Sequence, residues 1–303
     1  MTYATLFPAH VKLVEVGPRD GLQNERNSIP THQKIELINR LSETGLTAIE
    51  ATSFVSSKWV PQMEDALEVF TSIERKSQIT YPVLVPNLNG LERAVSAGVT
   101  EIAIFGSASE AFSQKNINCT ITESLERFQS VCLRALQKNI KIRGYISCTL
   151  GCPYQGAVSA HAVANIARQM IDLGCYEISL GDTIGAGTPL QAKKMIHAVL
   201  DEVPMEQLAI HFHDTRGQAL ANIYACLELG ISVIDSSIAG LGGCPYAKGA
   251  SGNVATEDLL YMLHGMNIDT GVNLAKVIEV GHFVQNGLGC QNRSKVGQAG
   301  ITQ

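Results

Sequence analysis

The sequence lacks the features that would place it in several specialised classes of protein. It contains no run of about 20 apolar residues, which a membrane-spanning helix requires. It contains no block of lysines and arginines, and its net charge is −5, so a nucleic-acid-binding surface is not expected. Hydrophobic residues make up 45% of the 303 residues and charged residues only 17%, which suits a compact globular chain. We therefore expect no nucleic acid and no membrane as a partner.

Targeting signals and a disulfide framework are also lacking. The first ten residues contain no basic region followed by an apolar run, and no arginine-rich amphipathic pattern of a transit peptide. The last four residues are not a peroxisomal signal. The eight cysteines are scattered along the chain, as is typical of reduced thiols. Together these observations predict a cytoplasmic protein.

Short apolar segments rich in β-branched residues alternate along the chain with segments of helical spacing. The expected strands are residues 11–16, 48–51, 79–85, 101–105, 141–147, 176–180, 208–213 and 233–237. The expected helices include residues 33–43, 91–97, 121–137, 160–172, 190–200 and 219–228. Eight strands that alternate with helices predict an α/β fold of the (β/α)₈ TIM-barrel type. A doubly wound open sheet is the alternative.

No linker, low-complexity tract or second-domain boundary interrupts this alternation. We therefore expect residues 1–303 to form a single domain. The segment from about residue 271 to residue 303 remains after the strands and helices are assigned, and it predicts an additional C-terminal helix followed by a mobile end.

Polar residues follow several of the expected strands at their carboxyl ends, where a parallel barrel gathers its functional groups. Arg19 and Asp20 come after Gly17 and Pro18 at the end of the first strand. Two adjacent charges there need solvent, each other or a ligand, because an unpaired buried charge is costly. Glu50 ends the second strand and Asp182 follows the sixth. These positions predict a functional site at one end of the fold.

His211 and His213 are two residues apart on one expected strand, so both side chains point to the same face. The pair alone is a weak signal, because two histidines bonded to loop carbonyls give the same pattern. Asp20 and Asn253, an amide in a glycine-rich loop, would add two oxygen ligands. Such a set suits Mg²⁺ or Mn²⁺, whereas structural zinc more often recruits thiolates. We predict one divalent cation, Mg²⁺ or Mn²⁺.

The glycine-rich segment 238–253 carries a single thiol, Cys244. Glycines allow close approach to a ligand and hinge motion, so this segment is interpreted as a lid that delivers a general acid or base. The alternative, an inert small hydrophobic side chain, is expected for most of the other cysteines. The turn 181–185 lacks the fingerprint of a dinucleotide site, so NAD is not expected. Neither PLP nor biotin is expected either.

Five sequence segments together resemble the 3-hydroxy-3-methylglutaryl-CoA (HMG-CoA) lyase family. They are residues 14–25, 51–56, 151–154, 179–185 and 240–253, and the resemblance runs from about Lys12 to Ile278. The Arg-Asp and His-x-His motifs are shared by a wider superfamily of metal-dependent, pyruvate carboxyltransferase-like barrels. The Gly-Gly-Cys-Pro-Tyr loop is specific to the lyase branch.

The resemblance implies a retro-Claisen cleavage of (S)-HMG-CoA, a small-molecule CoA thioester, into acetyl-CoA and acetoacetate by a homodimeric enzyme. It implies that the divalent cation is held by Asp20, His211, His213 and Asn253. It further implies that Arg19 stabilises the enolate and that Arg26 anchors the CoA phosphates. Cys244 would exchange protons, and the remaining members of the implied catalytic set are Glu50, Asp182 and His211.

Two alternatives to this function stay open at the level of sequence. A sister enzyme would either cleave a longer, isoprenoid-derived 3-hydroxyglutaryl-CoA or act as a Claisen-type synthase on acetyl-CoA and an oxo acid. A non-catalytic, metal-binding barrel would serve as a scaffold or sensor. The presence of the complete charged set, together with Cys244, argues against the second alternative.

Overall fold

Nine short parallel strands form the central sheet of the computed structural model, which describes residues 7–23, 25, 27–242 and 251–300. The strand order is β2-β1-β9-β8-β7-β6-β5-β4-β3, and every pair of neighbours is parallel. The predicted parallel α/β architecture is confirmed. The strands are β1 (Lys12–Glu15), β2 (Ala48–Ile49), β3 (Thr52–Ser53), β4 (Val83–Leu84), β5 (Glu101–Ser107), β6 (Lys141–Ser147), β7 (Glu177–Asp182), β8 (Leu208–Phe212) and β9 (Val233–Ser236).

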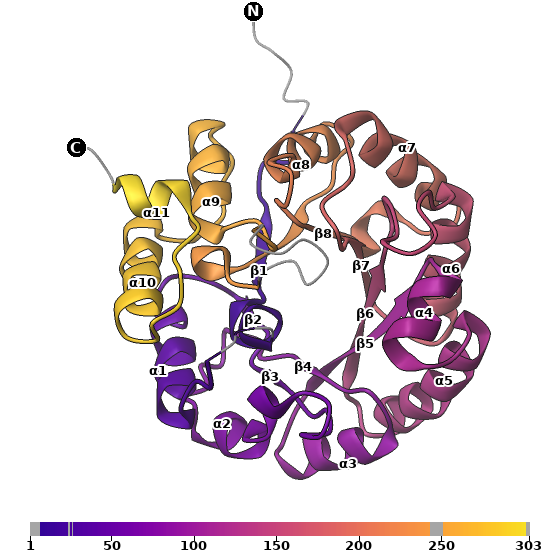
Figure 1. Ribbon diagram of the computed structural model, residues 1–303, viewed down its shortest axis with the longest axis horizontal. Coiled ribbons are helices and arrows are strands. Elements are labelled where there is room, and N and C mark those ends of the chain that lie inside the picture. Colours follow the sequence, from indigo (N-terminus) through magenta and orange to yellow (C-terminus); the bar gives the residue numbers. More distant parts are fainter. Residues whose placement is uncertain (1–6, 24, 26, 243–250, 301–303) are drawn as a thin grey trace, which may run out of the picture.

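The sheet curls so that the two strands at the ends of this order are neighbours in the chain. Only Glu50 and Ala51 separate β2 from β3. The Glu50 amide donates to the Glu15 carbonyl on one side (2.8 Å), and the Ala51 amide donates to the Pro82 carbonyl on the other (2.9 Å). The single strand expected at residues 48–51 is therefore two short strands, β2 and β3, which together span residues 48–53. Figure 1 shows the strands around a common centre with the helices outside them.

Eleven α-helices of the described residues cover the outside of the sheet. Those at 66–72, 110–117 and 256–265 were not among the helices expected from the sequence. The full set is α1 (Thr31–Leu41), α2 (Ala66–Ser72), α3 (Leu88–Ser96), α4 (Glu110–Ile117), α5 (Ile121–Gln137), α6 (Ala160–Asp172), α7 (Pro189–Leu200), α8 (Ala219–Leu227), α9 (Thr256–Gly265), α10 (Leu274–Asn286) and α11 (Lys295–Ala299). None of the helices in this part of the chain is long and apolar enough to cross a membrane.

Local sequence explains where several helices begin. Thr120 and Glu123 form a reciprocal capping box at the start of α5, which satisfies two backbone amides that the first turn leaves unpaired. Thr188 does the same with Gln191 at the start of α7, where Pro189 occupies the first helical position. These caps define where α5 begins after α4 and where α7 begins after β7.

The C-terminal segment contributes two helices, α10 and α11, rather than the single helix predicted. In the structure α10 packs against α1 and α9, and α11 packs against α9. The predicted mobile end falls mainly on residues 301–303, which lie outside the described residues.

The two faces of the strands differ in chemistry. Ile142, Ile178 and Ile210 are buried in one hydrophobic cluster with apolar side chains of the helices. The alternate positions of the same strands carry polar side chains on the inner face, among them Arg143 and His211. The hydrophobic core therefore lies between the sheet and the helices, and the inner face of the curled sheet is polar.

Candidate metal centre and substrate cavity

Three side chains from two strand ends meet at the carboxyl end of the sheet. Asp20 follows β1, His211 lies in β8 and His213 comes directly after β8. One ligand atom from each lies within 4.8 Å of the others. The Asp20 Oδ2 atom is 3.9 Å from His211 Nε2, and the two imidazole centroids are 5.5 Å apart. The prediction that these residues converge is thus met by the geometry.

A tight turn after β1 orients Asp20. The Val16 carbonyl accepts hydrogen bonds from the amides of Arg19, Asp20 and Gly21 at 2.7 to 3.2 Å. The Glu15 carboxylate accepts one from the Gly17 amide at 2.8 Å. Because the chain bends so sharply, Arg19 and Asp20 both reach the cavity side of the sheet.

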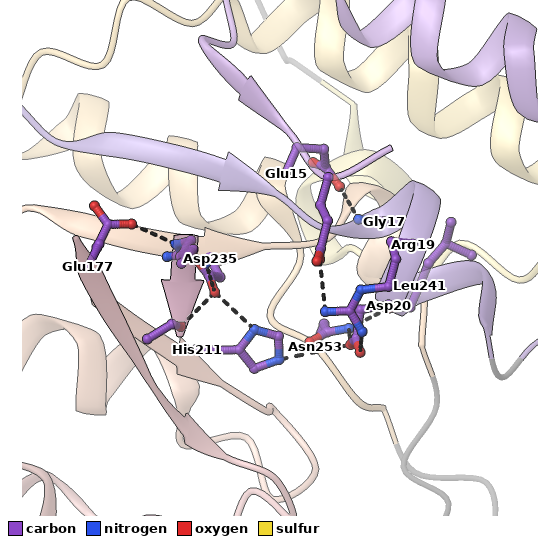
Figure 2. Close-up of polar contacts among 12 residues, drawn as sticks. Glu15, Gly17, Arg19, Asp20, Glu177, His211, Asp235, Leu241 and Asn253 are labelled. Atoms are coloured by element: carbon purple, nitrogen blue, oxygen red, sulfur yellow. Dashed lines mark hydrogen bonds and ion pairs between the residues drawn. The ribbon is translucent and has the colours of Figure 1, made fainter. Parts of the chain in front are cut away.

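Arg19 is buried between two carboxylates. Its Nη1 donates to Asp20 Oδ1 (2.7 Å), and its Nη2 lies 2.8 Å from Glu50 Oε2. Its guanidinium carbon lies 5.3 Å from the centroid of the Tyr145 ring. Burial opposes the charge, but the two carboxylates raise the pKa of Arg19 above its ordinary value. The site therefore holds a fixed cation, shown with Asp20 in Figure 2.

Electrostatics favour the ligand forms of Asp20 and His213, whereas at His211 the hydrogen bond with Asp235 and the nearby carboxylates outweigh burial and raise the pKa of the ring. Burial opposes ionisation of Asp20, but the nearby cationic groups and a hydrogen bond from Asn253 lower its pKa to about 2. Burial and the neighbouring His211 lower the pKa of His213 to about 4. At neutral pH Asp20 is therefore ionised and His213 is neutral, as cation binding requires.

One buried atom in particular fits a ligand-binding role. His213 Nδ1 is buried and has no hydrogen-bond partner among the residues that the structure describes. A buried polar atom without a partner costs free energy that a bound ligand recovers. Together with the carboxylate of Asp20 and the imidazole of His211, this donor set fits a divalent cation.

Asn253, at the C-terminal end of the glycine-rich segment 238–253, contacts the same cluster. Its Nδ2 donates to Asp20 Oδ2 (2.8 Å) and to the Leu241 carbonyl (3.1 Å). Gly242 has φ +93°, and a Cβ there would lie 2.7 Å from the Asn253 amide nitrogen. Only glycine allows this close approach, so the sequence of the loop contributes directly to the position of Asn253.

Asp182 and Glu50 are placed differently from each other. The Asp182 carboxylate accepts hydrogen bonds from the Ala186 and Gly187 amides (3.0 and 2.9 Å), so it faces its own turn and not the metal-centre side chains. Glu50 is fully buried beside Arg19, and neither carboxylate oxygen has an aligned hydrogen bond within the described residues. Burial raises the pKa of both carboxyls.

Two predicted site residues, Arg26 and Cys244, lie outside the described residues. The roles expected of them, in binding CoA and in proton exchange, stay predictions. Gly242, immediately before the segment that contains Cys244, lines the cavity.

A large cavity opens above the metal-centre side chains. Its base includes Arg19, Asp20, His211 and His213, and two cationic side chains, Lys115 and Arg127, line its wall. The other lining residues include Gln23, Ser53, Trp59, Asn87, Phe105, Phe112, Asn118, Phe128, Tyr145, Ser179, Thr183 and Gly242.

Sequence reasoning missed several polar residues beside the site. Tyr145 lines the cavity, with its ring 5.3 Å from Arg19 and 5.0 Å from Arg143. Ser179 lines the cavity too, and Asp235 lies directly beneath His211. The sequence signal that could have found these residues is the occurrence of polar side chains at alternate positions of otherwise apolar strands.

The HMGL-like family model matches residues 10–284. Over 293 residues the chain is 60% identical to the mitochondrial hydroxymethylglutaryl-CoA lyase of Gallus gallus, a match that covers 97% of this chain and 98% of that protein. The chain belongs to the HMGL-like family. The resemblance inferred from its motifs is confirmed.

Solved structures agree with this assignment. The crystal structure of hydroxymethylglutaryl-CoA lyase from Pseudomonas aeruginosa superposes with a TM-score of 0.96 at 56% identity, covering 97% of this chain and 98% of that one. An HMG-CoA lyase from Acinetobacter baumannii, solved with coenzyme A and 3-methylmalate, gives a TM-score of 0.92 at 39% identity, with 100% and 98% coverage. The HMGL-like chain described here shares both fold and length with these enzymes.

Proposed function

We propose that this chain cleaves (S)-3-hydroxy-3-methylglutaryl-CoA into acetyl-CoA and acetoacetate. The observation that carries the proposal is the convergence of Arg19, Asp20, His211 and His213 at the base of one cavity. Relatives at 60% and 56% identity are named as lyases for this substrate. The prediction of a carbon–carbon lyase is thus confirmed by the family.

Asp20, His211, His213 and Asn253 would hold one divalent cation, Mg²⁺ or Mn²⁺. A set of carboxylate, amide and imidazole donors without a thiolate supports this choice of ion. When bound, such a cation supplies Lewis-acid polarisation of substrate oxygens.

Arg19 would stabilise the enolate that develops on the thioester oxygen of the acetyl unit. Its guanidinium lies at the cavity base and is held by Asp20 and Glu50, so no reorganisation is needed as charge develops. Glu50 would keep Arg19 in place from the side away from the cavity. A fixed, desolvated cation of this kind is usually the largest single contribution to such a reaction.

Three further residues would take part in catalysis in different ways. His211 would act as a ligand of the cation at the reacting centre through Nε2, which faces Asp20. Asp182 would act by shaping the turn 183–187, where Gly185 lies against the His213 backbone. Cys244 would exchange protons with the substrate from the glycine-rich loop.

The substrate class is a CoA thioester. The A. baumannii relative was solved with coenzyme A and 3-methylmalate. In this chain Lys115 and Arg127 on the cavity wall support binding of an anionic molecule of that kind, and Arg26 would anchor the CoA phosphates.

For the protein as a whole we propose one domain over residues 1–303, in which the segment 48–53 closes the sheet into an eight-stranded TIM barrel with an extension from about residue 271. Its hydrogen bonds to strands on both sides support closure.

We propose a homodimer in the cytoplasm. Relatives are named for either the cytoplasm or mitochondria, and the seven described cysteines are free, as in a reducing compartment.

The test is an assay of the purified full-length chain with (S)-HMG-CoA and Mg²⁺, in which acetyl-CoA and acetoacetate are both quantified. We expect the two products in equal amounts. Parallel reactions contain a longer isoprenoid-derived homologue, or acetyl-CoA with an oxo acid. Faster turnover of the homologue would identify a sister lyase, and net condensation would identify a synthase; either result would contradict the proposal.

A further inference from the structure

A buried polar network lies directly beneath His211, on the inner face of the sheet. It consists of Arg143 on β6, Glu177 and Ser179 on β7, and Asp235 on β9, each no more than 5% exposed. The proposed chemistry does not use any of these side chains. Figure 2 shows Asp235 between Glu177 and His211.

The hydrogen bonds of this network converge on one carboxylate. Arg143 donates through Nη2 to Asp235 Oδ1 (2.7 Å) and through Nη1 to Asp235 Oδ2 (3.1 Å). Ser179 Oγ donates to the same Oδ2 atom at 2.7 Å. His211 Nδ1 lies 3.2 Å from that atom. Asp235 therefore links the guanidinium below to the imidazole above.

The chemistry of the acceptor determines which ring nitrogen carries the proton. An ionised carboxylate only accepts hydrogen bonds, so a hydrogen bond from His211 to Asp235 places the imidazole proton on Nδ1. In the neutral ring the other nitrogen, Nε2, then keeps its lone pair, and it is the atom that lies 3.9 Å from Asp20 Oδ2. The ring thus presents a free lone pair toward the metal-centre side chains.

We propose that Asp235 is a positioning residue for the metal centre: it fixes the ring orientation and tautomer of His211, and Arg143 and Ser179 hold Asp235 in place. The inference rests on the proposed metal site. A carboxylate behind a metal-binding histidine sets both the tautomer and the basicity of that ligand, and its loss typically weakens metal binding 10- to 100-fold.

Glu177 offers a matched control for a merely structural role. It pairs with the same guanidinium, through Arg143 Nε at 2.6 Å, and it is as deeply buried as its neighbours. Glu177 has no hydrogen bond to His211 among the described residues, whereas Asp235 has one. A substitution that only disturbs charge balance around Arg143 should therefore act alike at Glu177 and Asp235.

The first experiment measures Mn²⁺ affinity by electron paramagnetic resonance on the full chain carrying Asp235→Asn or Glu177→Gln. We expect about 10- to 100-fold weaker binding for Asp235→Asn and a change of less than about threefold for Glu177→Gln. Equal losses in the two variants, or affinity retained in Asp235→Asn, would overturn this inference but leave the proposed metal site intact. If the unaltered chain bound no Mn²⁺, the proposed metal site would fail and the inference with it.

The second experiment needs no metal and no substitution at Asp235. In metal-free protein labelled with ¹⁵N at its eight histidines, the His211 resonances should report a proton on Nδ1, assigned by their loss in His211→Gln. Ser179→Ala removes one of the donors to Asp235 Oδ2 and should broaden or shift those resonances. The spectra are recorded at a pH at which the ring is neutral, because the imidazolium carries a proton on both nitrogens. A proton on Nε2 of the neutral ring in the unaltered chain would overturn the inference even if Asp235→Asn failed to fold.

Discussion

The metal-centre side chains and the network beneath them are both charged and both buried, yet they differ in how fully their polar atoms are paired. In the deeper network, Arg143 and Asp235 bond to each other twice and to further partners. Above it, His213 Nδ1 and Arg19 Nε are buried and unpaired within the described residues. Unpaired buried atoms are costly, so they persist where a ligand completes them.

The comparison separates what a side chain does for the fold from what it does for the reaction. Substitutions in the deeper network should lower the free energy of unfolding. Substitutions in the upper cluster should mainly lower turnover, because its side chains keep polar atoms for a ligand instead of pairing them with one another. Two changes test this division, and a third, at Glu257 on α9, is a reference outside both groups.

Arg143→Met should have the largest effect. It removes the cation and leaves Glu177 and Asp235 buried without their main partner, and breaking a buried ion pair from one side costs about 3–5 kcal/mol. Urea unfolding of the metal-free chain measures this loss. A loss of less than about 1 kcal/mol would mean that the network contributes little to stability, which would contradict the division between a stabilising network and a reactive cluster.

Arg19→Lys should lower kcat by at least about 10²-fold, which corresponds to about 2.7 kcal/mol of transition-state stabilisation. Lysine keeps the charge but cannot contact Asp20 and Glu50 as a planar fork while also facing the cavity. The measurement is steady-state kinetics with saturating cation, and KM should change little. A kcat within threefold of the unaltered enzyme would reject the role of Arg19.

Glu257→Gln should change only the pH dependence of stability, and near pH 5 its effect should be the smallest of the three. Burial raises the pKa of Glu257 to about 8, and its carboxylate accepts a hydrogen bond from the Ala239 amide at 3.0 Å. The folded chain then keeps a proton that the unfolded chain releases near pH 4.5. Stability from this group is therefore fully present below about pH 4.5 and falls as the pH rises toward 8.

Glutamine cannot titrate, so the variant should lose this dependence. Relative to the unaltered chain, Glu257→Gln should gain stability steadily as the pH rises from about 4.5 to about 8, by up to about 1.4 kcal/mol for each pH unit. Chemical unfolding at several pH values measures the difference. Glu15 has a raised pKa of about 7 for the same reason, namely burial, and serves as the internal reference because it remains in both proteins. Parallel stability curves would contradict the expectation.

Much of the fold could be predicted from the sequence because apolar strands and amphipathic helices alternate with clear punctuation. The division of strand 48–53 could not, since it depends on which neighbours bond to Glu50 and Ala51. The short helix at 66–72 and the helix at 110–117 were missed for a related reason. Each lies within a connection between strands and is short, with seven residues in α2 and eight in α4 against 17 in α5.

The site was predictable where residues sit at the ends of parallel strands, because topology alone brings Asp20, His211 and His213 to one edge. The orientation of Asp182 was not, since its carboxylate is directed by backbone amides of its own turn. Asp235 was missed because its importance depends on strand register: β9 pairs with β8 so that Asp235 is opposite His211. Register between distant strands is not visible in a single sequence.

The most direct test of the account is metal removal from the intact enzyme, with the number of bound ions and the turnover measured on the same sample. We expect the chelated protein to be inactive but folded, and Mg²⁺ or Mn²⁺ to restore turnover in proportion to occupancy, up to about one Mn²⁺ per chain. His213→Ala should lower the affinity for Mn²⁺ and the turnover together. Full turnover by protein shown to be free of metal would contradict the account.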